Sequence, residues 1–398
     1  MNFITSYKVE LVINFIDLLL METSNSIVIV GGGLAGLTAA IHLSKLGYSV
    51  TLIEKNSYPK HKVCGEYVSN EVLPYLNWLD VNPSVLNPSK IDQLHFSIDN
   101  GTSVQTKLPL GGFGISRYGL DYFLYQKALE NRCVFIQETV TAINFEQNIF
   151  SVVLASNQII KSDFVLGAFG KRSNLDQKLE RNFIQKKSPW LAVKAHYKVD
   201  YPNDLVGLHH FKGGYCGVSK VEDNIVNVCY LADYKTFSKH KNIEMYESNV
   251  ISKNPFLKEI FEKASPIFEK PLTISQISFE KKNPVEQHII MIGDSAGLIH
   301  PLCGNGMAMA IHSAKIASEL IDEYLVKGKS KRSELEDKYE LAWHRHFGKR
   351  IKAGRWLGEL LQQPRLSQLV LQLVISFPFL LSAIIKSTHG KPIKVTGS

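Results

Sequence analysis

A glycine-rich turn joins an apolar strand to a helix in the stretch IVIVGGGLAGLTAA and limits what this chain can fold into. Gly31, Gly33 and Gly36 satisfy the GxGxxG pattern. The first glycine permits a tight turn, the second lets the backbone approach a pyrophosphate, and the third lets the helix pack against the strand. The helix begins near Leu34 and Ala35, where free N–H groups would face the phosphates. The pattern predicts a dinucleotide site; the alternative is a turn that only packs helix on strand.

The second strand, SVTLIEK, ends in Glu54 and Lys55, and Glu54 lies 18 positions after Gly36. An acid at this distance can accept hydrogen bonds from both hydroxyls of an adenosine ribose. Its negative charge would repel a 2′-phosphate. The site therefore predicts FAD or NAD and not NADP, with Glu54 and Lys55 among the residues that bind the cofactor.

A second glycine-rich turn, GDSAGLIHPLCGNGMAMA, follows the apolar run HIIMI and leads into another helical pattern. NAD dehydrogenases do not need a second turn of this kind. FAD extends beyond the pyrophosphate, so its ribityl chain and flavin ring require a further binding site. Gly293 and Asp294, at a strand end, would place a carboxylate near the ribityl hydroxyls. Gly304, Gly306 and Met307 would begin a helix whose N-terminus stabilises the negative charge of a reduced flavin ring. The two turns together predict FAD.

Six stretches, in their order and spacing, resemble the superfamily of FAD-dependent monooxygenases and geranylgeranyl reductases, which shares the fold of para-hydroxybenzoate hydroxylase. They span most of residues 26–320 and read VGGGLAGLTAA, KVCGEYVS, SRYGLDYFLYQKAL, GAFGKRS, GGYCGVSKVEDNIVNVCYL and GDSAGLIHPLCGNGMAMAI. The resemblance implies that Arg117 contacts the pyrophosphate region of FAD and that the backbone of Val140 touches adenine. It also implies that Asp294 binds the ribityl chain.

The sequence departs from this family in the middle motif, where hydroxylases carry an Asp-Gly pair that also serves NAD(P)H. Here the segment reads VLGAFGKRS, and no second GxGxxG lies between the two flavin motifs. NAD(P)H is therefore expected as a transient electron donor, with a different donor as the alternative. The aromatic-rich signature of flavin-dependent halogenases is not evident, and their catalytic lysine cannot be assigned.

The order of strand and helix patterns predicts an α/β protein: a Rossmann-like FAD-binding domain, an inserted β-sheet substrate domain and a helical C-terminal tail. The FAD-binding domain is expected at 21–185 with 272–330, the substrate-covering sheet at 186–271 and the helical region at 331–398. Residues 1–20 are expected to be an upstream extension, with Met21 as the natural start. A hairpin is predicted to turn at Asp99-Asn100-Gly101.

Four side chains are candidates for the substrate pocket. Cys64 and Tyr215 either face the pocket or belong to the core, and both readings have equal weight. Glu66 is either a proton relay or, as base rates favour, a surface carboxylate. His300 either donates to substrate or, as we favour, is a structural histidine with its hydrogen bonds satisfied. No histidine or cysteine spacing predicts a metal site.

The composition limits partners and compartment. The net charge of +8 is mild, and no stretch resembles a nucleic-acid module. Five scattered cysteines without a CxxC pair fit a reduced, cytoplasmic protein. The uncharged stretch 366–385 has the length of a membrane span, which is the alternative, but Gln, Ser and Pro interrupt it, so it predicts helices that cover the pocket or touch the inner face of a membrane. The basic run before it would suit an anionic leaflet. No pattern indicates an oligomeric state.

These features predict an FAD-dependent oxidoreductase with a lipophilic substrate. The leading hypothesis is a monooxygenase that hydroxylates a hydrophobic aromatic or polyketide-derived compound. The first alternative is a reductase of the geranylgeranyl type that saturates prenyl C=C bonds. The second alternative is a flavin-carrying, lipid-binding protein without catalysis. The shared motifs bind flavin and not substrate, so they do not separate the first two.

Overall fold

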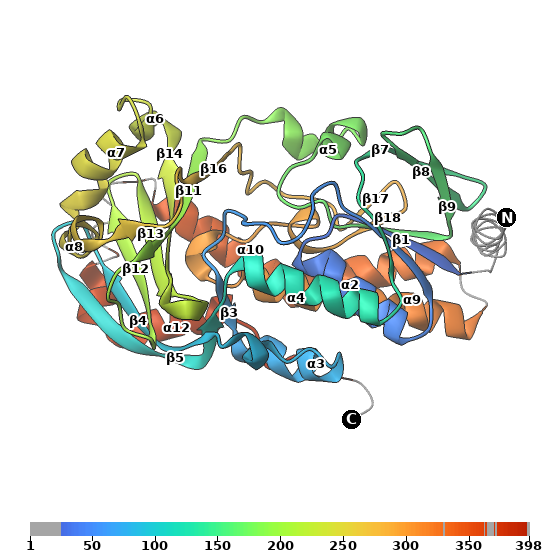
Figure 1. Ribbon diagram of the computed structural model, residues 1–398, viewed down its shortest axis with the longest axis horizontal. Helices are drawn as coiled ribbons and strands as arrows, with labels where there is room; N and C mark the ends of the chain where they lie inside the picture. Colours follow the sequence, from blue (N-terminus) through green and yellow to red (C-terminus); the bar gives the residue numbers. More distant parts are fainter. Residues whose placement is uncertain (1–24, 329–330, 362, 364–369, 371, 396–398) are drawn as a thin grey trace, which may run out of the picture.

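The computed structural model describes residues 25–328, 331–361, 363, 370 and 372–395 of the 398-residue chain. Two large sheets divide the molecule: the nine-stranded sheet lies at the left of Figure 1 and the six-stranded sheet toward the right. The predicted upstream extension, 1–20, lies outside the described residues.

The six-stranded sheet has the order β17-β18-β10-β1-β2-β6. Its strands are β1 (Ser26–Val30), β2 (Ser49–Ile53), β6 (Val134–Ile136), β10 (Phe164–Gly167), β17 (Val285–Glu286) and β18 (Ile289–Met291). All neighbours pair in parallel except β17 and β18. Because the carboxyl ends of parallel strands meet at one edge, the turns that follow β1, β2, β10 and β18 come together there.

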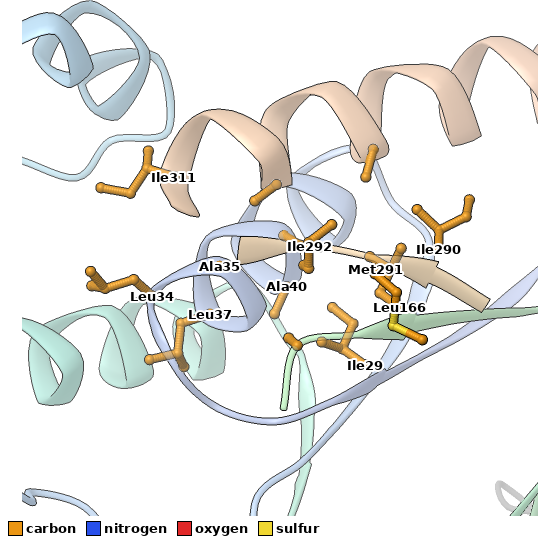
Figure 2. Packing of buried hydrophobic residues seen from close by; sticks show 14 of the residues in the cluster. Ile29, Leu34, Ala35, Leu37, Ala40, Leu166, Ile290, Met291, Ile292 and Ile311 are labelled. Atoms are coloured by element: carbon orange, nitrogen blue, oxygen red, sulfur yellow. The ribbon is translucent and has the colours of Figure 1, made fainter. Parts of the chain in front are cut away.

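Long helices cover this sheet: α2 (Leu34–Lys45), α4 (Arg117–Glu130), α9 (Gly306–Lys327) and α10 (Arg332–Leu361). Helix α2 packs against α4 and α9, and α9 packs against α10. Figure 2 shows Ala40 of α2 near Ile29 of β1 and Leu166 of β10, and residues of β18 and α9 belong to the same cluster. Burying a large aliphatic side chain of this kind stabilises the fold by about 1.5–3 kcal/mol relative to leaving it exposed. The two glycine-rich turns are therefore held by one continuous core.

The nine-stranded sheet has the order β15-β11-β14-β13-β12-β4-β5-β3, with β16 also pairing to β11. Its strands are β3 (Tyr67–Ser69), β4 (Ser89–Ser97), β5 (Ser103–Gly114), β11 (Trp190–Lys198), β12 (Leu205–Phe211), β13 (Gly214–Lys220), β14 (Val226–Asp233), β15 (Ser265–Pro266) and β16 (Leu272–Ser275). The predicted hairpin at Asp99-Asn100-Gly101 forms between β4 and β5.

The boundaries of the substrate-covering sheet differ from the expected 186–271. Strand β4 pairs in parallel with β12, so the hairpin and β3 belong to this sheet. The sequence instead predicts them in the FAD-binding domain. The reason is physical: alternation of polar and apolar residues identifies a hairpin but not the sheet that it joins.

The remaining elements are short. A three-stranded sheet contains β7 (Val140–Glu146), β8 (Ile149–Leu154) and β9 (Ile159–Ser162). The other helices are α3 (Leu73–Trp78), α5 (Asn174–Lys178), α6 (Tyr234–Phe237), α7 (Ile243–Asn249), α8 (Pro255–Lys263) and α12 (Pro378–Thr388). Helix α12 packs against β5, where Leu381 and Ile385 join Leu94 and Phe96 in an apolar cluster. Within the described part of the chain, no helix is long and apolar enough to cross a membrane.

Candidate functional site

The first glycine-rich turn has a geometry that admits only glycine at two positions. Gly31 has φ +108°, and a Cβ there would lie 2.3 Å from the carbonyl oxygen of Ala168. A Cβ on Gly36 would lie 2.0 Å from the carbonyl oxygen of Gly31. Strand β1, helix α2 and the turn after β10 therefore touch through backbone alone, as the GxGxxG pattern requires.

Helix α2 opens toward a cavity with its N-terminal N–H groups available. No described side chain caps it at Gly33, and a Cβ on Gly33 would meet only the Nη2 of Arg117, at 3.8 Å. Arg117 itself makes two bonds to Asp121, at 2.7 and 2.8 Å, and Lys62 Nζ lies 2.8 Å from the same carboxylate. Two cations against one carboxylate leave a net positive charge beside the helix N-terminus, which suits a diphosphate.

Glu54 follows β2 and borders the same cavity. Its Oε2 accepts the Gly32 N–H at 2.8 Å, and its Oε1 accepts the Asn56 N–H at 3.0 Å and the Asn56 side-chain amide at 2.6 Å. A carboxylate offers about four acceptor positions, so these bonds orient Glu54 and leave capacity for a ribose hydroxyl. Its role in ribose binding stays a prediction.

The second glycine-rich turn lies directly against the first. Gly293 has φ +62°, and a Cβ there would lie 2.9 Å from the Cβ of Ala35 in α2. The Gly293 N–H donates to the Ser313 hydroxyl of α9 at 2.8 Å. Helix α9 starts at Gly306, and no described side chain caps it at Asn305. Two uncapped helix N-termini, from α2 and α9, therefore open on one site.

One cavity of about 1140 Å³ connects these parts. Of the residues predicted to bind the cofactor or named as pocket candidates, all except Gly36 and His300 border it: Gly31, Gly33, Leu34, Ala35, Glu54, Lys55, Cys64, Glu66, Arg117, Val140, Tyr215, Gly293, Asp294, Gly304, Gly306 and Met307. Gly36 packs behind Gly31 instead. Sites for one ligand usually have about 300–1,000 Å³, so this cavity has room for more than one.

The residues present fit FAD. Glu54 and Val140 border the part of the cavity that would take adenosine, and α2 with Arg117 would hold the diphosphate. Asp294 lies in the turn after β18, and the N-terminus of α9 would face the flavin ring. When bound, FAD supplies the redox chemistry, and these residues supply position and electrostatics.

Two predicted pocket residues border the cavity from different parts of the chain. Cys64 borders it from the loop before β3 and is half-buried. Tyr215 borders it from β13 and also packs with Trp190 and Leu231, so it is both a pocket and a core residue. Burial raises the pKa of Tyr215, which therefore stays a neutral phenol at physiological pH.

The expectation that Glu66 is a surface carboxylate is wrong. Glu66 is fully buried, and its carboxylate bonds to Lys194 and, at 2.7 Å, to Nε2 of His196. Both partners lie on β11, and sequence reasoning missed them. A lysine and a histidine two positions apart on a strand do share a face, and in a run that is otherwise buried they signal a carboxylate partner.

The expectation of a satisfied His300 is also wrong. Both ring nitrogens are buried and find no hydrogen-bond partner among the described residues. The ring lies between Phe279, at 4.8 Å between centroids, and Trp190 and Tyr215, both at 5.9 Å. Burial lowers the pKa of His300 to about 4, so the imidazole is neutral.

Comparison with known proteins supports an FAD-dependent oxidoreductase. A family model described as FAD dependent oxidoreductase matches residues 26–63, and one described as squalene epoxidase matches residues 222–347. A digeranylgeranylglycerophospholipid reductase from Methanococcus vannielii is 24% identical over 82% of this chain and 84% of its own length. The ubiquinone hydroxylase UbiM from Neisseria meningitidis is 23% identical over 93% of this chain and 86% of its own.

The fold matches solved structures of flavin enzymes. The flavin-dependent brominase Bmp2 superposes with a TM-score of 0.76 at 18% identity, over 93% of this chain and 94% of that one. The glycine-rich turns, the cavity and these matches confirm the predicted FAD. This chain is an FAD-dependent oxidoreductase, similar in sequence to reductases and hydroxylases of the superfamily of FAD-dependent monooxygenases and geranylgeranyl reductases.

Proposed function

We propose that this enzyme hydroxylates a lipophilic aromatic substrate held between the nine-stranded sheet and the C-terminal helices. One observation carries the proposal: the cavity continues from the cofactor end into a space lined by aliphatic and aromatic side chains. On the sheet side these are Leu94, Phe96, Leu108, Val206 and Leu208; on the helical side they are Val370, Val374, Leu381, Ile384 and Ile385. Burying apolar substrate surface here is worth about 25 cal/mol per Å².

The match to the squalene epoxidase model and the resemblance to a ubiquinone hydroxylase support oxygen insertion. In hydroxylation, one atom of O₂ enters the substrate and the other leaves as water, with two electrons and two protons supplied to the site. A water-excluding pocket favours this reaction because it protects reactive oxygen species from side reactions. The chain's own part is to enclose the substrate and to exclude water.

Reduction of prenyl C=C bonds is the second candidate. The resemblance to a digeranylgeranylglycerophospholipid reductase favours it, as does the aliphatic character of the cavity wall. Reduction would add a hydride and a proton across each double bond and would use no oxygen. The same apolar space would hold the prenyl chain.

NAD(P)H is proposed as the transient electron donor. Lys171 and Arg172 belong to the middle motif VLGAFGKRS, which has glycine and alanine in place of the Asp-Gly pair of hydroxylases, and both border the cavity. Nη1 of Arg172 is buried without a hydrogen-bond partner in the described part of the chain. An unpaired guanidinium nitrogen is costly unless an anion meets it, and a nucleotide phosphate is such an anion.

We also propose peripheral contact with an anionic membrane surface, through a stripe on α10. Leu341, Arg345, Lys349, Lys352 and Trp356 recur every three or four residues and so share one helix face. Leu341 is 73% and Trp356 57% exposed, and no ion pair among the described residues holds the three cations. Such a face binds lipid headgroups by charge and anchors by its apolar ends.

The test separates the two reactions. Purified protein with FAD and NAD(P)H would be incubated under labelled O₂ with prenylated phenols and with prenyl lipids, and products analysed by mass. Gain of one labelled oxygen atom supports hydroxylation, and gain of two hydrogens supports reduction. Flavin reoxidation that no candidate substrate accelerates, with no product of either mass, would refute both.

A further inference from the structure

A buried cluster of charged side chains lies beside the cavity: Glu66, Lys194 and His196. Glu66 and Lys194 are fully buried and His196 is 2% exposed. Burial alone would raise the pKa of Glu66, but the hydrogen bond from His196 and the charge of Lys194 outweigh it and hold that pKa below its usual value. Glu66 is therefore a carboxylate at neutral pH.

Hydrogen bonds from α4 and from β11 hold the Glu66 carboxylate in place. The Arg117 N–H, at the start of α4, donates to Glu66 Oε1 at 2.7 Å, while Lys194 and His196 reach Glu66 from β11. Glu66 has φ +56°, a left-handed conformation that costs about 1–3 kcal/mol in a residue other than glycine. Removing each charged group from water costs several kcal/mol more in desolvation free energy. Apolar side chains could pack the loop of Glu66 against α4 and β11 at a lower free-energy cost, so we infer that the charges serve a function other than stability.

His61 links this cluster to solvent. Its ring stacks on Tyr118 of α4, at 4.5 Å between centroids, and meets His196 edge-on at 5.1 Å. Tyr118 is 43% exposed. His61 also borders the cavity, and its Nδ1 is buried without a partner among the residues that the structure describes. One imidazole thus touches the cavity, the buried cluster and a ring at the surface.

The charges around His61 favour its neutral form. Burial lowers the pKa of His61 to about 4, Lys194 and His196 on β11 lower it as well, and Glu66 acts in the opposite direction. Tyr118 from α4 and Phe268 from the segment before β16 complete its surroundings. A neutral imidazole has one nitrogen that accepts and one that donates, so it can pass a proton without holding it.

We propose that His61 passes protons between solvent and the cavity, and that Lys194 and His196 of the cluster oppose a lasting positive charge on its ring. The inference rests on the flavin part of the proposed function and not on its substrate. Its simplest case is the return of two electrons from the reduced cofactor to O₂, which leaves as hydrogen peroxide. One of the two protons comes with the reduced cofactor, and the other moves from solvent through His61 to oxygen.

The experiment needs no organic substrate, so its result is independent of the hydroxylation and reduction hypotheses. FAD-loaded protein would be photoreduced and mixed with O₂ in H₂O and in D₂O, and flavin absorbance followed. We expect His61→Gln to slow reoxidation at least tenfold and to increase the solvent isotope effect, because proton delivery then limits the rate. Imidazole should restore the rate of His61→Ala, which a merely structural role would not allow. His344→Gln, at an exposed position of α10, is the matched control.

A second readout does not depend on the cofactor. Histidine-labelled protein would be titrated by NMR, with His61 assigned from the His61→Gln spectrum. In Lys194→Met the pKa of His61 should rise, because a positive neighbour is removed. Unchanged reoxidation and isotope effect in His61→Gln, with the variant folded and FAD-loaded, would overturn the proposal. An unshifted His61 pKa in a folded Lys194→Met variant would overturn the role of the cluster.

Discussion

Replacing Lys194 by methionine tests how strongly the buried ionic cluster couples three parts of the fold. The variant keeps the length of the side chain but leaves the Glu66 carboxylate buried with only His196 and the Arg117 N–H. Removing one partner of a buried ion pair typically costs 3–5 kcal/mol. Because Lys194 has no exposed surface, solvent cannot screen or replace the lost charge. We therefore expect the free energy of unfolding to fall by about 3–5 kcal/mol.

A double-mutant cycle isolates the pair. Glu66→Gln should also destabilise, since it leaves an ammonium buried, while Glu66→Gln with Lys194→Met should cost less than the sum of the two by at least about 2 kcal/mol. Unfolding in urea, followed by circular dichroism, measures all four proteins. Since the pKa of Glu66 is lowered, its contribution is present above the unfolded-state pKa and lost on acidification, so Glu66→Gln should flatten that loss. Additive single mutations, or a cost of Lys194→Met below about 1 kcal/mol, would refute the reasoning.

Four further predictions follow from features of the site and the surface. Gly36→Ala should abolish FAD binding or folding, because its Cβ would lie 2.0 Å from a carbonyl oxygen, and flavin content after reconstitution measures it. Ile385→Trp should exclude long-chain substrates from the cavity while Leu373→Trp, at a 52% exposed position, should not, which product assays across chain lengths would show. Changing Arg345, Lys349 and Lys352 together to serine should reduce binding to anionic but not neutral vesicles at least tenfold, and equal sedimentation with both lipids would contradict the stripe. Burial raises the pKa of Glu247 from 4.5 to about 7, so the folded protein loses stability as pH rises through that range. Since one pKa unit is worth about 1.4 kcal/mol, Glu247→Gln should be more stable than the wild type by up to about 3 kcal/mol above neutral pH and equally stable below pH 4.5. Chemical unfolding at both pH values measures the difference.

The cofactor end of the site could be predicted from the sequence because its function requires particular backbone conformations. Gly31 and Gly293 both have positive φ, and Gly36 allows two backbones to touch. Only glycine meets these demands at low cost, so the requirement is visible in the residue type itself. The strand and helix on either side of each turn then confirm the context that the motif needs.

The ionic cluster and the mixed sheet could not be predicted in the same way. Lys194 and His196 are separated from Glu66 by more than a hundred residues, and nothing in the loop around Glu66 shows that β11 covers it. The surroundings of His300 leave no local pattern either, because the rings around it come from three other segments of the chain. Such contacts are set by tertiary packing and leave no local pattern.

The parallel pairing of β4 with β12 decides how the enzyme could be recombined with its relatives. Residues Gln93–Ser97 lie in register with Leu205–His209, and the sheet continues through β5 to β3. A chimera that exchanged only 186–271 would pair β4 from one parent with β12 from the other, so the side chains across this ladder would no longer be matched. The smallest exchangeable unit that keeps the ladder whole therefore has two separate pieces, 67–114 and 190–275, and both must come from the same parent.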